Sequence, residues 1–200
     1  MIHPIPPRNI IGKDYVAYWE DFLSDQEINR ILTAPEWDSL ENAVVGGQDD
    51  KTVLNTDIRT SEVAWMRKNA WNEPLWERLS TVVAEVNRRY FHFDLSGFYE
   101  PFQLGMYKEE NQGHYSWHTD MAMSDNNVPR KLSMSLLLSD PSEFEGGNLE
   151  IKGINDEPMN LELRKGRAWF FPSWVLHRVS PVTRGVRKSL VVWVGGPPFK

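Results

Sequence analysis

Apolar residues in the N-terminal half of the chain recur at helical spacing in two places. Asn72 and Pro74 are typical of a helix start, and an apolar face follows them at Leu75, Leu79, Val82, Val83, Val86 and Tyr90. Ser24-Asp25-Gln26-Glu27 has the pattern of a capping box, with apolar residues behind it at Ile28, Ile31 and Leu32. The pattern therefore predicts one short and one long helix before residue 99.

From residue 99 onward the pattern changes to short apolar runs separated by turn residues. The runs at 102–107, 131–138, 149–152, 161–163, 168–171 and 190–194 each fit a strand. Turns are predicted at 146–147, 155–156, 165–166 and 184–185, where Gly, Asn and Asp occur. So many short strands predict an α+β fold, with a double-stranded β-helix (jelly roll) core and helices packed outside.

The length of 200 residues favours a single domain over residues 1–200. We expect residues 14–98 to supply helices and edge strands, and residues 99–195 to form the jelly-roll core. A polar loop at residues 46–51, within the wider segment 44–54, lies between the two predicted helices. Its composition suits a mobile lid over a binding site, and it suits an inert surface loop equally well.

Composition narrows the class of protein. Apolar residues make up 40% and charged residues 25%, which is typical of a globular chain, and no run of 18 apolar residues predicts a membrane span. The N-terminal residues lack the apolar stretch of a signal peptide. Cysteine is absent, which excludes disulfides and thiolate metal sites and is compatible with the cytoplasm. A net charge of −6 argues against a nucleic-acid partner.

The candidate chemistry begins at His118-Thr119-Asp120, which a distal histidine, His177, follows after a strongly apolar run. Side chains alternate along an extended segment, so His118 and Asp120 are expected on one face. Two imidazoles and one carboxylate form the set that holds non-haem Fe(II) with open coordination positions. A lone histidine after an apolar run is more often a packed residue, so the metal site is predicted from His118, Asp120 and His177 together and not from His177 alone. His114 is set aside, because four residues of strand place it more than ~12 Å from His118.

Arg187 follows His177 by ten residues, and the segment between them reads as a strand end, a turn at 184–185 and the start of the next strand. This connection would bring Arg187 into the interior beside His177. A buried guanidinium requires an anion, and a dicarboxylate can supply one through a bidentate contact. The alternative is that Arg184, Arg187 and Lys188 form a solvated turn.

With these residues in place, the sequence resembles the Fe(II)- and 2-oxoglutarate-dependent dioxygenases, specifically the prolyl 4-hydroxylase-like group. The resemblance covers roughly residues 99 to 195 and rests on the segments 103–107, 115–120, 130–133, 138–140, 145–149, 166–172, 177–179 and 181–189, with weaker similarity at 22–27 and 58–61. It implies that His118, Asp120 and His177 bind iron and that Arg187 binds the far carboxylate of 2-oxoglutarate. It also implies that Tyr107 and Ser133 contact this cosubstrate. An arginine at position 187 is the residue of the group's bacterial members, where its animal collagen-type members have lysine.

The resemblance implies hydroxylation of an unactivated C–H bond with Fe(II), 2-oxoglutarate and O2, release of succinate and CO2, and ascorbate as a candidate reductant. A prolyl residue in a peptide or protein is the expected substrate, and a free amino acid or other small metabolite is the alternative. A non-catalytic metal-binding jelly-roll interaction module is a second alternative. Tyr115, Trp117 and Trp193 are candidate substrate contacts, for which core packing is an equal explanation.

Overall fold

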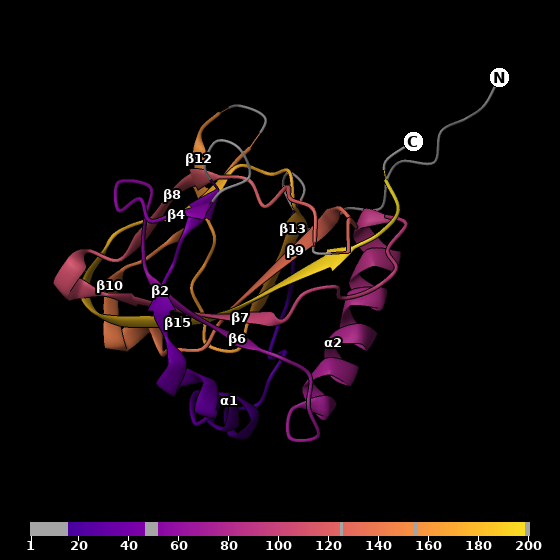
Figure 1. Ribbon diagram of the computed structural model, residues 1–200, viewed down its shortest axis with the longest axis horizontal. Helices are drawn as coiled ribbons and strands as arrows, with labels where there is room; N and C mark the ends of the chain where they lie inside the picture. The colour runs from indigo at the N-terminus through magenta and orange to yellow at the C-terminus, as the bar shows by residue number, and fades with distance from the viewer. Residues whose placement is uncertain (1–15, 47–51, 125, 154–155, 199–200) are drawn as a thin grey trace.

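The computed structural model describes residues 16–46, 52–124, 126–153 and 156–198, and they form two facing antiparallel sheets with helices on one side (Figure 1). The helices are α1 (Asp25–Leu32) and α2 (Glu73–Val86), with a π-helical turn at Asn87–Phe91. The strands are β1 (Ala17–Trp19), β2 (Glu41–Asn42), β3 (Val45–Gly46), β4 (Thr52–Val53), β5 (Arg59–Thr60), β6 (Glu62–Met66), β7 (Phe102–Lys108), β8 (His114–His118), β9 (Arg130–Leu137), β10 (Phe144–Gly146), β11 (Leu149–Lys152), β12 (Pro158–Asn160), β13 (Ala168–Pro172), β14 (His177–Val179) and β15 (Val182–Gly195).

The larger sheet has eight strands in the order β1-β13-β9-β15-β7-β6-β2, with β10 also paired to β15. The smaller sheet has the order β12-β11-β14-β8-β5, and β3 and β4 form a separate pair. Neighbouring strands in the sequence are therefore divided between two sheets, as in a jelly roll. The predicted α+β fold with a jelly-roll core is confirmed. The division of the chain at residues 98 and 99 stays a prediction, although β1, β2 and β6 pair within the same sheet as the C-terminal strands.

Both helices cover the outer face of the larger sheet, where the main hydrophobic core lies (Figure 1). The predicted capping box is present, because the Ser24 hydroxyl and the Glu27 carboxylate each bond the other's backbone N–H. The predicted face of α2 is buried at Leu79, Val82, Val83 and Val86. Tyr90 departs from this face and is 36% exposed, because the π-helical turn shifts the helical phase after Val86.

Alternation along the central strands separates this outer core from the inner face of the sheet. In β9 and β15 every second residue packs into the outer core, namely Leu132, Met134, Leu136, Leu190, Val192 and Val194. The residues between them point to the smaller sheet and include polar side chains, namely Ser133, Ser135, Arg187 and Ser189. One strand thus supplies packing to one face and chemistry to the other.

Two sequence expectations about the strands are wrong. Residues 161–163 form no strand, because β12 comes just before them and Leu161 instead donates its backbone N–H to Leu149 O. Residues 184–185 are no turn between strands, since β15 runs continuously through Gly185. Gly185 has φ +73° and marks the point where β15 changes its partner from β10 to β7.

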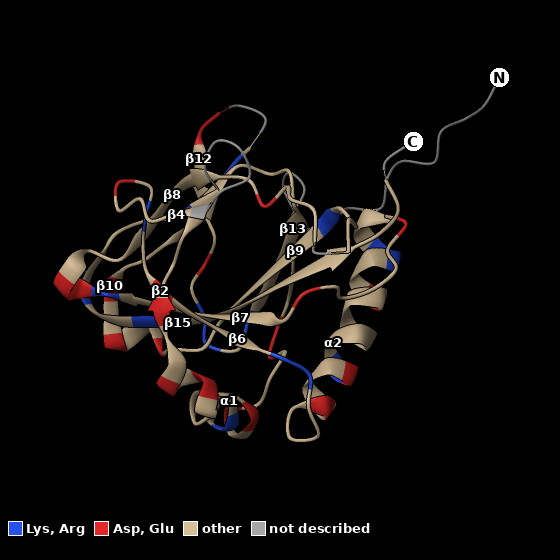
Figure 2. Cartoon of the chain, viewed as in Figure 1, with Lys and Arg blue, Asp and Glu red and all other residues tan. Residues whose placement is uncertain are grey.

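The remaining expectations concern the surface of the molecule. The loop at 46–51 falls largely outside the described residues; on its N-terminal side Val44, Val45 and Gly46 line the central cavity. Figure 2 shows acidic residues on α1 and around β10. Neither helix in the described part of the chain has the length and apolar character needed to cross a membrane.

Candidate active site

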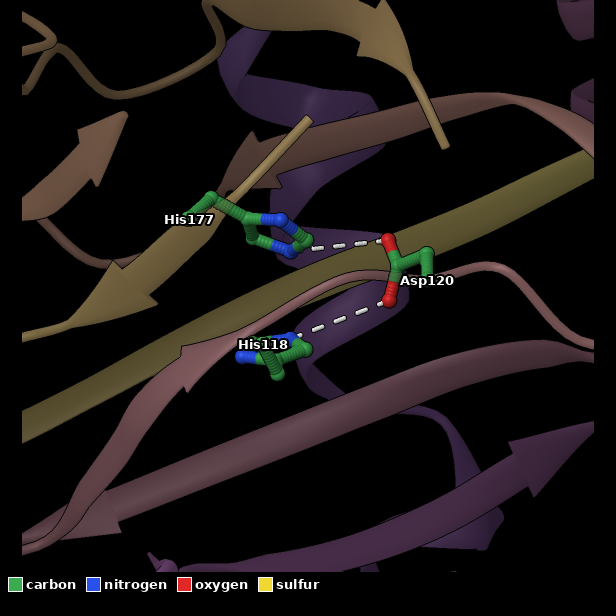
Figure 3. A group of neighbouring side chains, drawn as sticks. All are labelled: His118, Asp120 and His177. Atoms are coloured by element: carbon green, nitrogen blue, oxygen red, sulfur yellow. Dashed lines mark ion pairs between the residues drawn. The ribbon is translucent and has the colours of Figure 1, made fainter. Parts of the chain in front are cut away.

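His118, Asp120 and His177 meet between the two sheets, as Figure 3 shows. His118 ends β8 and His177 begins β14, and these two residues are direct partners in the ladder. Asp120 lies just beyond β8, where its backbone N–H donates to Ser173 O at 2.8 Å. One ligand atom from each residue lies within 4.8 Å of the others. The predicted set therefore has the spacing of a metal centre, although the loop that positions Asp120 is not a strand.

Backbone carbonyls orient both imidazoles. Nδ1 of His118 is 2.8 Å from Ser116 O, and Nδ1 of His177 is 2.9 Å from Val175 O. A carbonyl only accepts hydrogen bonds, so each Nδ1 carries the proton and each Nε2 presents a lone pair. The Nε2 atoms lie 3.8 Å and 3.5 Å from the Asp120 oxygens. Burial, and then the neighbouring His177, lower the pKa of His118 to about 3, which keeps this ring neutral and able to bind a metal.

Asp120 is held as a carboxylate. Burial alone would raise its pKa, but the two histidines, followed by Trp193 and Ser133, outweigh burial and lower it. The Trp193 indole N–H is buried without a partner at hydrogen-bonding distance, and it points its positive end toward this carboxylate. Ser133 is fully buried, and its hydroxyl lies 3.0 Å from the Ser173 hydroxyl. Ser133 therefore lies close to Asp120, and its predicted contact with the cosubstrate stays a prediction.

A cavity of about 500 Å³ connects the three ligands to Arg187. Arg187 is 2% exposed, and its only hydrogen bond among the described residues is from Nη1 to Ser189 Oγ at 3.1 Å. Its Nε is buried without a partner, and its guanidinium lies 5.3 Å from the Tyr107 ring centre. Burial lowers the pKa of Arg187, because no carboxylate compensates for the loss of water. The side chain is thus buried, as predicted from the sequence, and its Nε is available to bind an anion.

Gly147 explains how the arginine stem fits. It has φ +60°, and a Cβ at this position would lie 2.8 Å from Arg187 Cδ and 3.0 Å from a Val182 methyl. A side chain at residue 147 would therefore displace Arg187 as well as strain the backbone. Gly147 thus makes room for Arg187 in the cavity, in addition to its part in the turn.

The three aromatic candidates have different positions. Tyr115 lines the cavity and stacks on His118, with ring centres 3.4 Å apart. A register shift between β14 and β8 lets both residues face inward despite their odd spacing. Trp193 also lines the cavity. Trp117 does not, because it points to the outer surface of the smaller sheet, between Arg178 at 4.7 Å and Lys152 at 5.5 Å. Trp117 thus lies outside the cavity lining, and its role as a substrate contact stays a prediction.

Several cavity residues are missed by sequence reasoning. They are Arg59, Trp65, Gln103, Met121, Arg130, Ser135 and Ser189. A signal exists for two of them, because Ser135 and Ser189 occupy the inward positions of strands whose other face is apolar. The others come from β5, β6, β7, β9 and a loop, and only the fold brings them together.

The donor set fits a metal that accepts two neutral imidazoles and one carboxylate and keeps positions open for other ligands. The unpartnered Arg187 Nε, in the same cavity, fits a carboxylate-bearing cosubstrate. A jelly roll with these features defines a non-haem iron oxygenase as the class of protein.

Comparison with known proteins gives the same class. Residues 102–195 match the 2OG-Fe(II) oxygenase superfamily. A PKHD-type hydroxylase of Klebsiella pneumoniae subsp. pneumoniae is 28% identical over 173 residues, covering 84% of this chain and 71% of that protein. A PKHD-type hydroxylase of Picosynechococcus is 42% identical over 80 residues, covering 40% of this chain and 36% of that protein.

Solved structures support the fold. A Pseudomonas putida prolyl-4-hydroxylase has a TM-score of 0.70 at 20% identity, covering 92% of this chain and 94% of that chain. A Trichoplax adhaerens prolyl hydroxylase, solved with a hypoxia inducible factor peptide fragment, has a TM-score of 0.72 at 15% identity, covering 91% and 84%. The family match, the PKHD-type relatives and the prolyl hydroxylase structures together support a prolyl hydroxylase-like Fe(II)- and 2-oxoglutarate-dependent oxygenase. The chain is thus a hydroxylase with Fe(II), 2-oxoglutarate and O2 as its cofactor and cosubstrates.

Proposed function

We propose that this enzyme hydroxylates a prolyl residue in a peptide or protein, converting 2-oxoglutarate and O2 to succinate and CO2 in the same turnover. One oxygen atom of O2 enters the substrate C–H bond and the other enters succinate. The observation that carries the proposal is that one cavity is lined by His118, Asp120 and His177 and also by Arg187, whose Nε has no partner.

Arg187 binds the far carboxylate of 2-oxoglutarate in this proposal. The free Nε and the Nη groups of a guanidinium match the two oxygens of a carboxylate, and burial strengthens the contact. Tyr107 is 4% exposed beside this guanidinium, and its hydroxyl is the second polar group for the cosubstrate. Ser189 holds Nη1 of Arg187, which positions the guanidinium.

The three ligands would hold Fe(II), which would activate O2 for oxidation of the substrate once the cosubstrate is bound. The protein contributes orientation and the exclusion of water. Asp120 stays ionised beside Trp193 and Ser133, while the carbonyls of Ser116 and Val175 fix the two histidine rings. Tyr115 covers one face of His118 and excludes water from it.

The rim of the cavity favours a polypeptide substrate. Val44, Trp65 and Met121 line the cavity, yet they are 47%, 43% and 59% exposed. Exposed apolar side chains that surround an opening are typical of a surface that receives another chain. The aromatic rings of Trp65, Tyr115 and Trp193 provide walls for an apolar ring such as that of proline. The prolyl hydroxylase complex with a peptide fragment supports the same substrate class.

Mass spectrometry on a library of proline-containing peptides tests the proposal. With Fe(II), 2-oxoglutarate and O2, the wild type is expected to add 16 Da to prolyl residues and to release one succinate per addition. His177→Ala should lose this activity by more than about 100-fold, since a direct ligand matters more than its supporting partners. His114→Ala removes a histidine of the neighbouring strand β8 that lies outside the metal group, and it should retain activity. Oxidation of free amino acids with no peptide product would refute the polypeptide assignment.

A further inference from the structure

Three arginines line the cavity, and their partners differ. Arg187 faces the proposed cosubstrate site. Arg130 forms an ion pair with Glu100 and lies 3.7 Å over the Trp193 ring. Arg59 has no carboxylate partner among the described residues. Its Nε donates to Ser61 Oγ at 2.8 Å and its Nη2 to Gln103 Oε1 at 2.9 Å, and both acceptors are neutral.

Arg59 is 7% exposed, so its charge has lost most of its water. Burying a guanidinium against neutral partners alone is unfavourable, because hydrogen bonds from an amide and a hydroxyl do not replace a counter-charge. Its Nη1 makes no hydrogen bond within the described part of the chain, although the side chain lines the cavity. One face of a buried cation is therefore directed at a space that a ligand can fill.

The charges of the loaded cavity leave Arg59 unbalanced. In the proposed function, Fe(II) and Arg187 bring three positive charges, and Asp120 and dianionic 2-oxoglutarate bring three negative charges. Arg130 is neutralised by Glu100. Among the charged residues of the described part of the chain that line the cavity, only Arg59 then lacks a counter-charge.

Arg59 is also close to the reacting centre. Its guanidinium lies 4.5 Å from the centre of the Tyr115 ring, and the same ring stacks on His118 with ring centres 3.4 Å apart. The cation and an iron ligand thus contact the same aromatic ring. A group bound to Arg59 would hold the neighbouring carbon atoms of the substrate over the metal, on the side that Trp65 and Met121 leave open.

We propose that Arg59 is a specificity-determining residue that binds a carboxylate of the substrate next to the carbon that is oxidised. The inference rests on the proposed function and sharpens it, because it requires a prolyl substrate with a nearby carboxylate. Two sources have the same chemistry: the side chain of an adjacent Asp or Glu, and the free carboxyl group of a C-terminal proline. A neutral prolyl segment would leave the cation of Arg59 buried and unpaired.

Calorimetric titration with two matched peptide pairs tests the proposal without turnover. The protein is loaded with Zn(II) and saturating 2-oxoglutarate. One pair contains Asp or Asn beside proline in an amidated peptide, and the other ends in proline as the free acid or the amide. Wild type should bind the charged member of one pair about 10- to 100-fold more tightly, since a hydrogen bond to a charged group is worth that ratio. The pair that responds identifies the source of the carboxylate.

Variants separate recognition from structural support. Arg59→Gln keeps hydrogen-bonding capacity without the charge, and its selectivity ratio should fall close to one. Arg59→Lys should retain part of the ratio. Arg184→Gln, which removes an exposed arginine paired with Glu145, should keep the full ratio and controls for the net charge. In each variant 2-oxoglutarate must still raise the Tm, which shows that the cavity is intact.

The outcomes also separate this inference from the proposed function. Equal binding of charged and neutral peptides by wild type, no binding of any of them, or an unchanged ratio in Arg59→Gln would overturn the role of Arg59. If iron-loaded wild type then hydroxylates neutral prolyl peptides, the proposed function stands without it. Carboxylate selectivity with no prolyl hydroxylation would leave Arg59 in its role and remove proline as the target.

Discussion

The two faces of β15 differ in what their residues contribute. On the outer face Leu190, Val192 and Val194 are fully or almost fully buried against the helices and neighbouring strands. On the inner face Arg187 and Ser189 are equally buried, yet one is charged and the other polar. Apolar burial stabilises the fold, whereas a buried charge without a counter-ion destabilises it. A single strand thus combines a stabilising face with a face that is completed only by a ligand.

This difference shows how the fold can tolerate an unfavourable active site. The outer core is continuous across β6, β7, β9, β13 and β15 and includes both helices, while a smaller apolar cluster with Tyr107, Phe171 and Val182 lies between the sheets. The inner face can then keep the unpartnered Nε of Arg187 and the charge of Arg59. Mutations on the two faces should therefore separate stability from ligand binding.

The largest effect on stability is expected from the outer face. Leu190→Ala removes a fully buried side chain and should lower the free energy of unfolding by about 2–5 kcal/mol. The folded variant should keep the affinity of the wild type for 2-oxoglutarate, because Leu190 does not line the cavity. Urea denaturation and calorimetric titration measure the two quantities. Val191→Ala, the next residue and one that lines the cavity, should cost less stability. A larger loss of stability in Val191→Ala than in Leu190→Ala would show that the outer face is not the main source of stability.

A mutation of Arg187 on the inner face should not lower the stability of the ligand-free protein, in contrast to Leu190→Ala on the outer face. Arg187→Met replaces a buried, unpaired guanidinium with an apolar side chain, so the ligand-free variant should be as stable as wild type or about 1–4 kcal/mol more stable. In the metal-loaded wild type, 2-oxoglutarate at 100 times its Kd should add about 2.7 kcal/mol. The variant should lose this gain. Thermal unfolding with and without 2-oxoglutarate measures both effects.

Arg184→Met is the matched control for this experiment, because Arg184 lies three residues earlier in the same strand and is exposed. It should leave both the stability and the effect of 2-oxoglutarate close to their wild-type values. A ligand-free Arg187→Met protein that is strongly destabilised would contradict the view that this arginine is costly to the fold. Full stabilisation of Arg187→Met by 2-oxoglutarate would remove Arg187 from the cosubstrate site.

Much of this arrangement is predictable because it has local causes. The capping box at Ser24 and Glu27 is satisfied within one turn, and the face of α2 follows from helical spacing. The His118 and Asp120 pair is adjacent in the sequence, and His177 is recognisable through its spacing to Arg187 as part of a known pattern. These features depend on few long-range contacts, so the sequence alone predicts them correctly.

The failures share a different cause, which is pairing between distant segments. Gly185 reads as a turn residue, but pairing with β10 and β7 keeps β15 extended through it. Trp117 reads as a neighbour of the metal ligands, yet the register shift in β8 turns it outward and Tyr115 inward. Arg59 lies 59 residues before His118 and becomes its neighbour only when β5 pairs with β8. Ladder register and strand order decide such positions.

The smallest predicted effect tests whether a change outside both faces leaves the cavity untouched. Burial opposes ionisation of Glu27, but hydrogen bonds from Ser24 and the charge of Arg78 outweigh it and lower the pKa below its ordinary 4.5. A lowered folded-state pKa stabilises the protein above the unfolded-state pKa, and this stability is lost as the pH falls through the folded-state value. Glu27→Gln should therefore be less stable than wild type at pH 7, by at most about 1 kcal/mol because the site is exposed. The difference should shrink as the pH falls below 4.5.

Urea denaturation at pH 7 and at a pH below 4.5 measures this difference in stability. A difference that does not change with pH would assign the effect to lost contacts instead of charge. Since α1 lies on the far side of the larger sheet, affinity for 2-oxoglutarate should not change, and a change would show that the two faces are coupled.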